Sequence, residues 1–383
     1  MTDSADGGSA DSADEESTER DAADPPVVVR EARPADADAI VAFTRDTWGD
    51  RHEDYLPRVF PEWVAADDPD RGTFVATLPP EAIEDADAVA GSDDREAGDT
   101  LIEGDGTGAA APGDPEAVVG CIQGALLTEW EAWGQGIRVD PAARGFGVGT
   151  ALSTAALDWA RERGATVCRN MVFSWNVAGL GQSRAVGFEP ATEFRFARPE
   201  PAADADPETT RFRERPDPDP NAAWAFWVDS DARDHLRGLA LDDGESWACS
   251  ELTRERLRTA DDDGRLLAVA DGDAKAADDA RGRTAGFAVR TRVSERPSDD
   301  GDDAPERVAV YGVAAWRDAD AAGAIYKAIA ADAAAVDADA TRVLIPETVE
   351  HVSDTGANRV PVAGEPDFVM RADLTDGGAP ADL

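Results

Sequence analysis

Lysine is almost missing from this chain of 383 residues: only Lys275 and Lys327 occur, and arginine supplies the other basic side chains. Acidic residues number 80 against 37 basic ones, which gives a formal net charge of −43. Such a charge repels other polyanions, and binding to DNA or RNA requires basic side chains that neutralise phosphates. Nucleic acids and anionic membrane surfaces are therefore excluded as expected partners.

Cysteine and histidine are also scarce, with three of each. Cys121, Cys168 and Cys249 lie far apart and form neither a CxxC pair nor a disulfide framework. Cys121 and Cys168 stand in apolar runs, so we expect buried structural thiols. The scattered histidines show no metal-ligand spacing, and we expect no metal.

No run of about 18 apolar residues and no signal peptide occur, which predicts no membrane span. The acidic, lysine-poor composition resembles that of a haloarchaeal cytoplasmic protein, and we expect a cytoplasmic location. Molar salt would then screen the self-repulsion of the folded chain. A generically acidic protein from a moderate environment is the alternative, but it explains the shortage of lysine less well.

The length favours two domains joined by a linker. Residues 1–25 contain almost no large apolar side chain and are expected to be a disordered acidic tail. The remaining segments are predicted as a first domain at 26–198 with an acidic insertion at about 79–115, a Pro- and Asp-rich linker at 199–220, a second domain at 221–376 and a tail at 377–383.

The most informative stretch is a strand, a glycine-rich turn and a helix between Gln135 and Arg161. Apolar and polar residues alternate up to Val139, and Asp140-Pro141 end the strand. The turn reads Arg144-Gly145-Phe146-Gly147-Val148-Gly149 and precedes the helix. Free N–H groups at a helix start bind phosphate oxygens, and glycines let the phosphate approach the backbone. The stretch therefore predicts a pyrophosphate site.

Several glycine loops bind phosphates, and their spacings differ. A P-loop is excluded because the Gly-Lys-Ser/Thr ending is missing, and the dinucleotide fingerprint fits poorly because the third glycine comes one position early. The alternative is an ordinary glycine-rich connection that binds no phosphate. Arg-x-x-Gly-x-Gly is the spacing that fits, and here the chain resembles the GNAT family of N-acetyltransferases. This resemblance implies acetyl-CoA as acyl donor, bound by Ile137, Val139, Arg144, Gly145, Phe146, Gly147, Val148, Gly149 and Thr150.

The next segment resembles the family pattern Asn-x-x-Ala-x-x-Leu-Tyr-x-x-x-Gly-Phe. Asn176, Gly187 and Phe188 match it, which implies that Asn176 contacts the cofactor. Ser183 stands where the family has a tyrosine that is proposed to protonate the departing sulfur. Ser183 is therefore the candidate acid, although its side chain is shorter and less acidic. The resemblance further implies an oxyanion site made by a backbone N–H near Val139.

The second half repeats the element order of the first, which predicts a second, degenerate GNAT-like domain. Strands are expected at Ala223–Val228 and Phe368–Leu374, the latter closing the second domain, and a helix at Asp231–Ala240. The first domain is expected to end in a strand pair near Phe196. Aspartates at 318 and 320 replace the phosphate-loop glycines, so we expect no CoA there. The second domain would be a structural or dimerising partner, or one wall of the acceptor site.

The sequence thus predicts an α/β fold with a mixed sheet: two tandem GNAT-like domains, each a mostly antiparallel sheet flanked by helices. The resemblance implies an acyl-CoA-dependent N-acetyltransferase that acts on a primary amine of a small molecule or protein. Glu129 is the candidate general base, with Glu131 second. The alternative is a non-catalytic acyl-CoA-binding or sensing protein, while a nucleotide-binding oxidoreductase fits the glycine spacing poorly. The protein could be a monomer or a homodimer.

Overall fold

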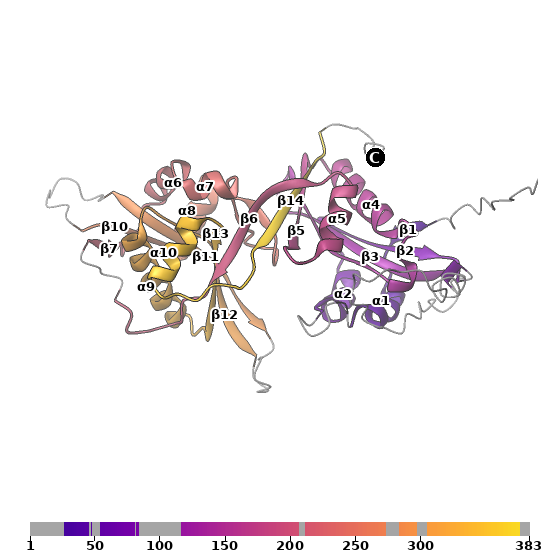
Figure 1. Ribbon diagram of the computed structural model, residues 1–383, viewed down its shortest axis with the longest axis horizontal. Coiled ribbons are helices and arrows are strands. Elements are labelled where there is room, and N and C mark those ends of the chain that lie inside the picture. The colour runs from indigo at the N-terminus through magenta and orange to yellow at the C-terminus, as the bar shows by residue number, and fades with distance from the viewer. Residues whose placement is uncertain are drawn as a thin grey trace, which may run out of the picture.

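A single mixed sheet of twelve strands runs through the computed structural model, with helices on both of its faces (Figure 1). The structure describes residues 27–45, 47, 54–80, 82–83, 116–206, 211–272, 283–296 and 305–375. The predicted tails, and residues 84–115 of the predicted insertion, lie outside these residues. The strand order is β1-β2-β3-β4-β5-β14-β6-β13-β12-β11-β10-β7.

The first half of the chain forms the right-hand lobe of Figure 1. Its strands are β1 Val28–Glu31, β2 Arg71–Leu78, β3 Ala117–Leu126, β4 Glu131–Val139, β5 Val167–Phe173 and β6 Glu189–Ala197. Its described helices are η1 Pro34–Asp36, α1 Ala37–Thr44, α2 Leu56–Ala65, η3 Pro141–Ala143, α4 Val148–Glu162 and α5 Val177–Ala185.

The second half forms the left-hand lobe and repeats this order of elements. Its strands are β7 Phe212–Glu214, β8 Leu239–Leu241, β9 Cys249–Glu251, β10 Leu266–Asp271, β11 Thr284–Arg296, β12 Glu306–Trp316, β13 Ala340–Pro346 and β14 Asp367–Asp373. Its helices are α6 Pro220–Val228, α7 Asp231–Leu236, α8 Arg254–Asp262, α9 Ala319–Ala335 and α10 Val349–Ala357. Strands β8 and β9 form a separate two-stranded sheet.

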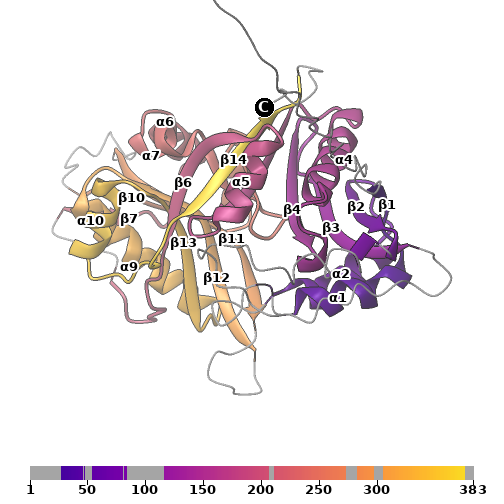
Figure 2. The same ribbon diagram turned by 45° about the vertical axis from the view of Figure 1, so that its right-hand side comes forward.

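The two halves exchange their last strands. β14, from the end of the chain, lies between β5 and β6 and is antiparallel to both. β6 of the first half pairs in turn with β13 of the second. Figures 1 and 2 both show β6 and β14 side by side where the lobes meet. The strand at Phe368–Leu374 is therefore present as predicted, but it does not close the second half alone. The strand pair predicted near Phe196 is likewise a single strand, β6.

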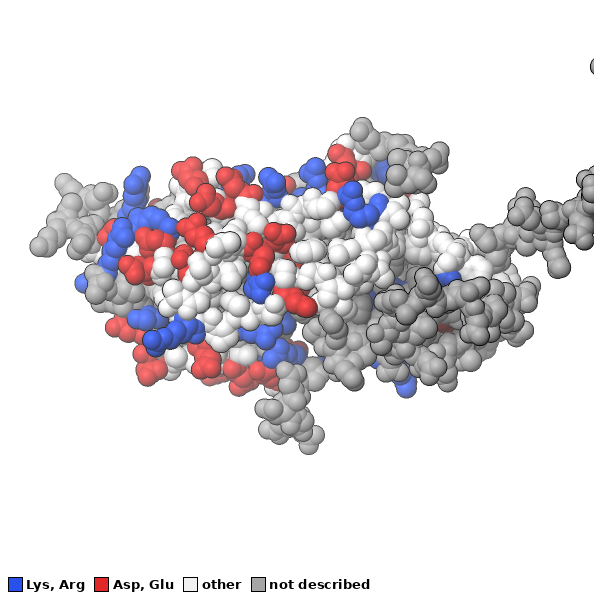
Figure 3. All heavy atoms as spheres, in the orientation of Figure 1, with Lys and Arg blue, Asp and Glu red and all other residues white. Residues whose placement is uncertain are grey.

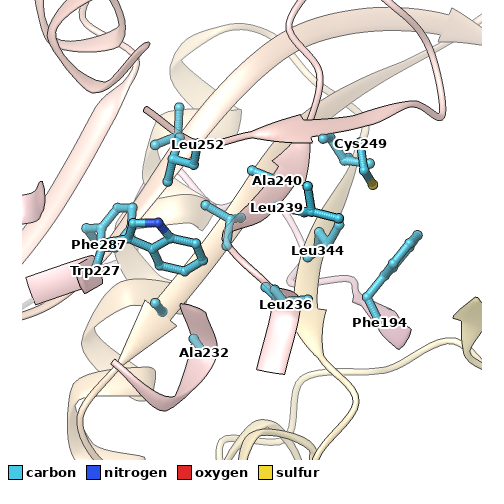
Figure 4. Packing of buried hydrophobic residues seen from close by; sticks show 14 of the residues in the cluster. Phe194, Trp227, Ala232, Leu236, Leu239, Ala240, Cys249, Leu252, Phe287 and Leu344 are labelled. Carbon is cyan, nitrogen blue, oxygen red and sulfur yellow. The ribbon is translucent and has the colours of Figure 1, made fainter. Parts of the chain in front are cut away.

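The segment Ala223–Val228 is helical, so the strand predicted there is wrong. Pro220 occupies the first turn of α6, and the Asp219 side chain accepts a hydrogen bond from the Asn221 N–H, both of which favour a helix start. The segment is apolar throughout, and such a run does not distinguish a strand from a buried helix. Trp227 packs on Phe287 of β11 with ring centroids 6.0 Å apart (Figure 4).

Two further boundaries differ from the prediction. The helix predicted at Asp231–Ala240 ends at Leu236, and residues 239–241 form β8. Arg237 and Gly238 both have positive φ, which ends the helix. The first strand of the second half is β7, within residues 199–220 where a linker was expected.

The first-half sheet is covered differently on its two faces. On one face, Trp159 of α4 lies so close to Gly72 and Gly124 that a Cβ at either glycine would meet its ring within 3 Å. On the other face, α1 and α2 pack Ile40 and Phe60 against Cys121 of β3. The second half contributes to this other face as well, because Trp133 of β4 is buried in the core cluster formed mainly by second-half residues. Both halves therefore surround the middle of β4.

Candidate functional site

The glycine-rich turn ends at an uncapped helix start. Gly145 and Gly147 have φ of +91° and +74°, and nothing lies within 4 Å of a Cβ built at either position. Gly147 is the N-cap of α4, and among the described residues there is no side-chain cap hydrogen bond at this helix start. Arg144 is exposed at the mouth of the turn and makes no ion pair within the part of the chain that the structure describes. Free backbone donors, open space and a guanidinium thus meet at one point.

Strands β4 and β5 separate just before this turn. They are parallel but pair only through Glu131, Ala132 and Trp133 at the start of β4. Among the described residues, no ladder pair joins β4 to β5 beyond Trp133. The backbone of Gln135, Ile137 and Val139 therefore has no strand partner on the side of β5. Gly136 has a φ of +65° and lies against Trp63 of α2, where a Cβ would come within 2.8 Å of the ring. The irregular backbone therefore opens a wedge between the strands.

Helix α5 is bonded to the start of α4 and to β5. Asn176 caps this helix, since its side chain accepts a hydrogen bond from the Gly179 N–H at 2.9 Å. Gln182, where the family pattern has leucine, donates to the Gly149 carbonyl at 3.0 Å and to Ser153 at 2.8 Å. These bonds fix α5 to the first turn of α4 and so hold the glycine-rich turn in place.

Ser183 is buried on α5 and already hydrogen-bonded. Its side chain accepts a bond from Asn170 Nδ2 of β5 at 3.1 Å, and the residue is only 2% exposed. A hydroxyl in this position can polarise its surroundings but has little access to a leaving group.

The two predicted carboxylates lie at the paired end of β4. Glu129 is exposed on the turn between β3 and β4, at the opposite end of β4 from the glycine-rich turn. Glu131 is fully buried and forms an ion pair with Arg169 of β5. It also accepts a hydrogen bond from the Glu251 N–H of the second half at 3.1 Å. Glu131 therefore joins the two halves, and its carboxylate is fully occupied.

A different carboxylate lies where the wedge opens. Glu245 belongs to the loop between β8 and β9, and its Oε1 accepts a hydrogen bond from Gln135 Nε2 at 3.1 Å. It also forms an ion pair with Arg71 of β2. Gln135 in turn donates to Gln123, which donates to Thr73. This polar cluster, Arg71, Thr73, Gln123, Gln135 and Glu245, lies on the face of β4 opposite α4.

The corresponding helix start in the second half is closed. Asp318 caps α9, with its side chain accepting a hydrogen bond from the Ala321 N–H at 3.0 Å. The same carboxylate lies 3.3 Å from Arg211. A carboxylate therefore occupies the place that α4 leaves open for an anion.

The sequence matches a family model over the segment that builds this wedge. Residues 37–181 match the acetyltransferase (GNAT) family. A search of curated proteins found no match to this sequence. Among solved structures, a GCN5-related N-acetyltransferase from Sphaerobacter thermophilus is 14% identical, with 93% of this chain and 98% of that chain covered and a TM-score of 0.52. A tandem GNAT protein from the clavulanic acid biosynthesis pathway is 14% identical, with coverages of 92% and 100% and a TM-score of 0.47.

The similarity to the Sphaerobacter thermophilus structure confirms the predicted fold class, a mixed α/β architecture with GNAT-like topology over nearly the whole chain. The GNAT match includes β4, the glycine-rich turn and α4, and it ends within α5. The loop that carries Glu245 lies outside the match. No local motif marks Glu245, and only the contact between the halves brings it to β4.

The cysteines and candidate metal ligands contribute little to this site. All three thiols are buried, as predicted for Cys121 and Cys168, and burial raises the pKa of each to about 12. Among the described residues, no group of three or more His, Cys, Asp and Glu side chains could hold a metal ion. No helix in the described part of the chain is long and apolar enough to cross a membrane.

Proposed function

We propose that the first half binds acetyl-CoA and transfers its acetyl group to a primary amine. The observation that carries this proposal is the uncapped start of α4, reached through two glycines with positive φ and placed where β4 and β5 separate. The pyrophosphate would accept hydrogen bonds from the N–H groups of residues 147–150, with Arg144 beside it. The family match over residues 37–181 supports the assignment.

The acyl group would lie in the wedge. A backbone N–H of β4 near Val139 faces the side that β5 leaves unpaired, and it can donate to the thioester oxygen as negative charge develops there. The amine nitrogen attacks the carbonyl carbon, the C–N bond forms, and the C–S bond breaks to release the thiolate. Ile137 and Asn176 would line the path of the donor, as the resemblance implies.

A base must remove a proton from the amine. Glu129 remains the prediction from the sequence, but its place on the exposed turn separates it from the wedge by the paired end of β4. Glu245 is better placed, because it is hydrogen-bonded to Gln135 just beyond the last ladder pair between β4 and β5. We therefore propose that Glu245 attracts and orients the ammonium group, which then loses its proton to solvent water at the open wedge. This role would make the second half a wall of the acceptor site.

The alternative is an acyl-CoA sensor without turnover. One observation favours it: the Ser183 hydroxyl, which replaces the tyrosine of the family pattern, is buried and bonded to Asn170. Without an acidic side chain at this position, an enzyme would have to use solvent to protonate the departing thiolate. A sensor releases no thiolate and needs no acid.

Turnover separates the two functions. Release of free thiol from acetyl-CoA is measured against a panel of primary amines for the wild type, Glu245→Gln and Glu129→Gln. We expect amine-dependent release that falls at least tenfold in Glu245→Gln, mainly through a higher KM for the amine, and changes less than twofold in Glu129→Gln. Binding of acetyl-CoA without release for any amine would favour the sensor, and a loss confined to Glu129→Gln would restore Glu129 as the base.

A further inference from the structure

A small cavity lies where the exchanged strand β6 meets the second-half sheet. Its volume is about 50 Å³, and its polar lining consists of Arg292, Arg342 and Ser294, with Phe196 and Trp247 as aromatic walls. A buried water requires roughly 10–15 Å³ by this measure. The cavity therefore has room for a few waters or for one carboxylate or phosphate group.

Arg342 enters this cavity without an anionic partner. Its guanidinium carbon lies 4.2 Å from the ring centroid of Trp247 and 4.9 Å from that of Phe196. Among the described residues it makes no ion pair and no hydrogen bond. Charges removed from water in proteins are normally paired, and the half-buried Arg342 guanidinium offers five N–H donors to an anion. In a chain with a net charge of −43, an arginine left without a carboxylate is an informative exception.

The other charges around Arg342 are mostly positive. Burial, and then the charges of Arg296, Arg198 and Arg292, lower the pKa of Arg342 to about 10, and only the carboxyl of Asp367 opposes this change. Nη1 of Arg292 donates hydrogen bonds to the backbone carbonyls of Asp242 and Glu245, at 2.9 and 3.5 Å, and not to a carboxylate. Burial lowers the pKa of Arg292, while the nearby carboxyl groups of Asp242, Glu245 and Asp243 raise it, so the poorly compensated charge of the cavity is mainly that of Arg342.

Trp247 is held over Arg342 in an uncommon backbone conformation. Its φ is +66°, a region that bulky residues rarely occupy. The ring also packs edge-on against Phe196 and Phe173, with centroids 5.9 and 6.5 Å away. The loop is braced by Asp242, whose side chain accepts hydrogen bonds from the Gly244 and Glu245 N–H groups at 2.9 and 2.8 Å. A strained, braced aromatic wall indicates a preformed site.

We propose that this cavity is an oxyanion-binding site, which takes a carboxylate or phosphate group of a small molecule between Arg292 and Arg342, with the Ser294 hydroxyl as a further donor. Guanidinium groups suit either anion, because their fork of donors matches two oxygens at once. The stacked rings hold the Arg342 fork in position and so reduce the entropy lost on binding.

The site is placed to influence the first half. Trp247, which covers Arg342, and Glu245, which bonds Gln135 of β4, belong to the same braced loop. An anion that orders this loop would also order the carboxylate beside the wedge. The binding site itself does not depend on the proposed acetyl transfer, since none of its residues contacts the glycine-rich turn.

Calorimetric titration of the full-length protein tests the proposal. Potassium phosphate and potassium acetate are titrated separately into the wild type, Arg342→Gln, Arg292→Gln and Arg233→Gln, at a constant KCl concentration at which circular dichroism shows folded protein. Arg233 is the matched control, because it lies on the surface of α7 beside Asp234 and away from the cavity. Gly147→Asp is titrated as well, so that phosphate binding at the proposed CoA loop can be recognised.

We expect saturable binding of one anion to the wild type, to Arg233→Gln and to Gly147→Asp, and at least tenfold weaker binding to Arg342→Gln and Arg292→Gln. Tighter phosphate binding would identify a phosphorylated ligand, and tighter acetate binding a carboxylate ligand. Arg342→Gln should melt at a higher temperature than the wild type without anion, which shows that its loss of binding is not misfolding. No saturable binding to the wild type, or equal binding to all variants, would overturn the site.

Discussion

Gly147 and Asp318 are the N-cap residues of α4 and α9, and the presence or absence of a side chain there determines whether the helix start is capped. Gly147 leaves the first turn of α4 uncapped, whereas the Asp318 carboxylate accepts the Ala321 N–H and fills the first turn of α9. A difference of one side chain thus separates an uncapped helix start, which could accept an anion, from a capped one. The residue at a helix start can be read directly from the sequence. The contrast between the glycine-rich turn and residues 317–323 could therefore be predicted.

Asp367 supplies a prediction at the same scale. It is buried at the start of β14, and burial raises its pKa to about 7, against the charges of Arg342 and Arg195, while Glu365 raises it further. Between about pH 4 and pH 7 the folded state therefore holds a proton that the unfolded state has lost. Because the unfolded state binds fewer protons, the free energy of unfolding falls as pH rises through this window.

The variant Asp367→Asn should lack this pH-dependent fall in the free energy of unfolding, because asparagine does not titrate. The free energy of unfolding of the variant minus that of the wild type should therefore increase between pH 4 and pH 8. The increase should reach up to about 4 kcal/mol, at about 1.4 kcal/mol per pH unit. Urea unfolding of both proteins across that range measures the difference. The other titrating carboxyl groups are common to both proteins and largely cancel. A stability difference that does not change with pH would contradict the assignment.

At the scale of elements, the exchange of β6 and β14 is the feature that the sequence did not reveal. Each segment reads as a strand, but the apolar pattern of Phe368–Leu374 is the same whether it pairs within its own half or between β5 and β6. Partner choice is decided by long-range packing and not by local pattern. The helix α6 was missed for a related reason: its apolar run lacks periodicity, although Asp219-Pro220 marked its start. Long-range packing between the halves also brings Glu245 to Gln135 of β4, and Phe196 of β6 to Trp247 and Arg342.

The exchange predicts that the two halves unfold together. Val369 is fully buried between the halves, in the core cluster that also contains Trp133 and Phe194. Val369→Ala removes two methyl groups there and should destabilise the protein by about 2 kcal/mol. Differential scanning calorimetry should show one transition, shifted as a whole to lower temperature.

Arg371→Ala provides the control on the same strand, because this side chain is exposed and its loss should cost no more than about 0.5 kcal/mol. If Val369→Ala separated the melting into two transitions, or if the wild type already showed two, the halves would be independent units.

At the scale of the whole molecule, the net charge of −43 dominates. Figure 3 shows acidic and basic side chains interspersed over the second-half lobe, and several of them form exposed ion pairs such as Arg258 with Glu255. Such pairs are worth little individually and do not offset so large an excess of like charge. Self-repulsion should therefore weaken the fold at low ionic strength, as the composition suggested.

Thermal unfolding in increasing KCl tests this. We expect the melting temperature to rise steadily from dilute buffer towards molar salt, because the Debye length falls from about 10 Å at 0.1 M to about 3 Å at 1 M. Sodium chloride at matched ionic strength should act similarly if screening is the cause. A stable fold in dilute buffer, with a melting temperature that salt does not change, would refute the halophilic interpretation.

Calorimetric titration of acetyl-CoA tests most directly whether the turn before α4 is the acyl-donor site. Gly147→Asp places a carboxylate at the uncapped helix start, and Gly264→Asp makes the same change at an exposed glycine of similar φ, +65°, with open space around it in the second half. We expect acetyl-CoA to bind to the wild type and to Gly264→Asp, and binding to be lost in Gly147→Asp. Absence of binding to the folded wild type, or equal binding to both variants, would contradict this assignment.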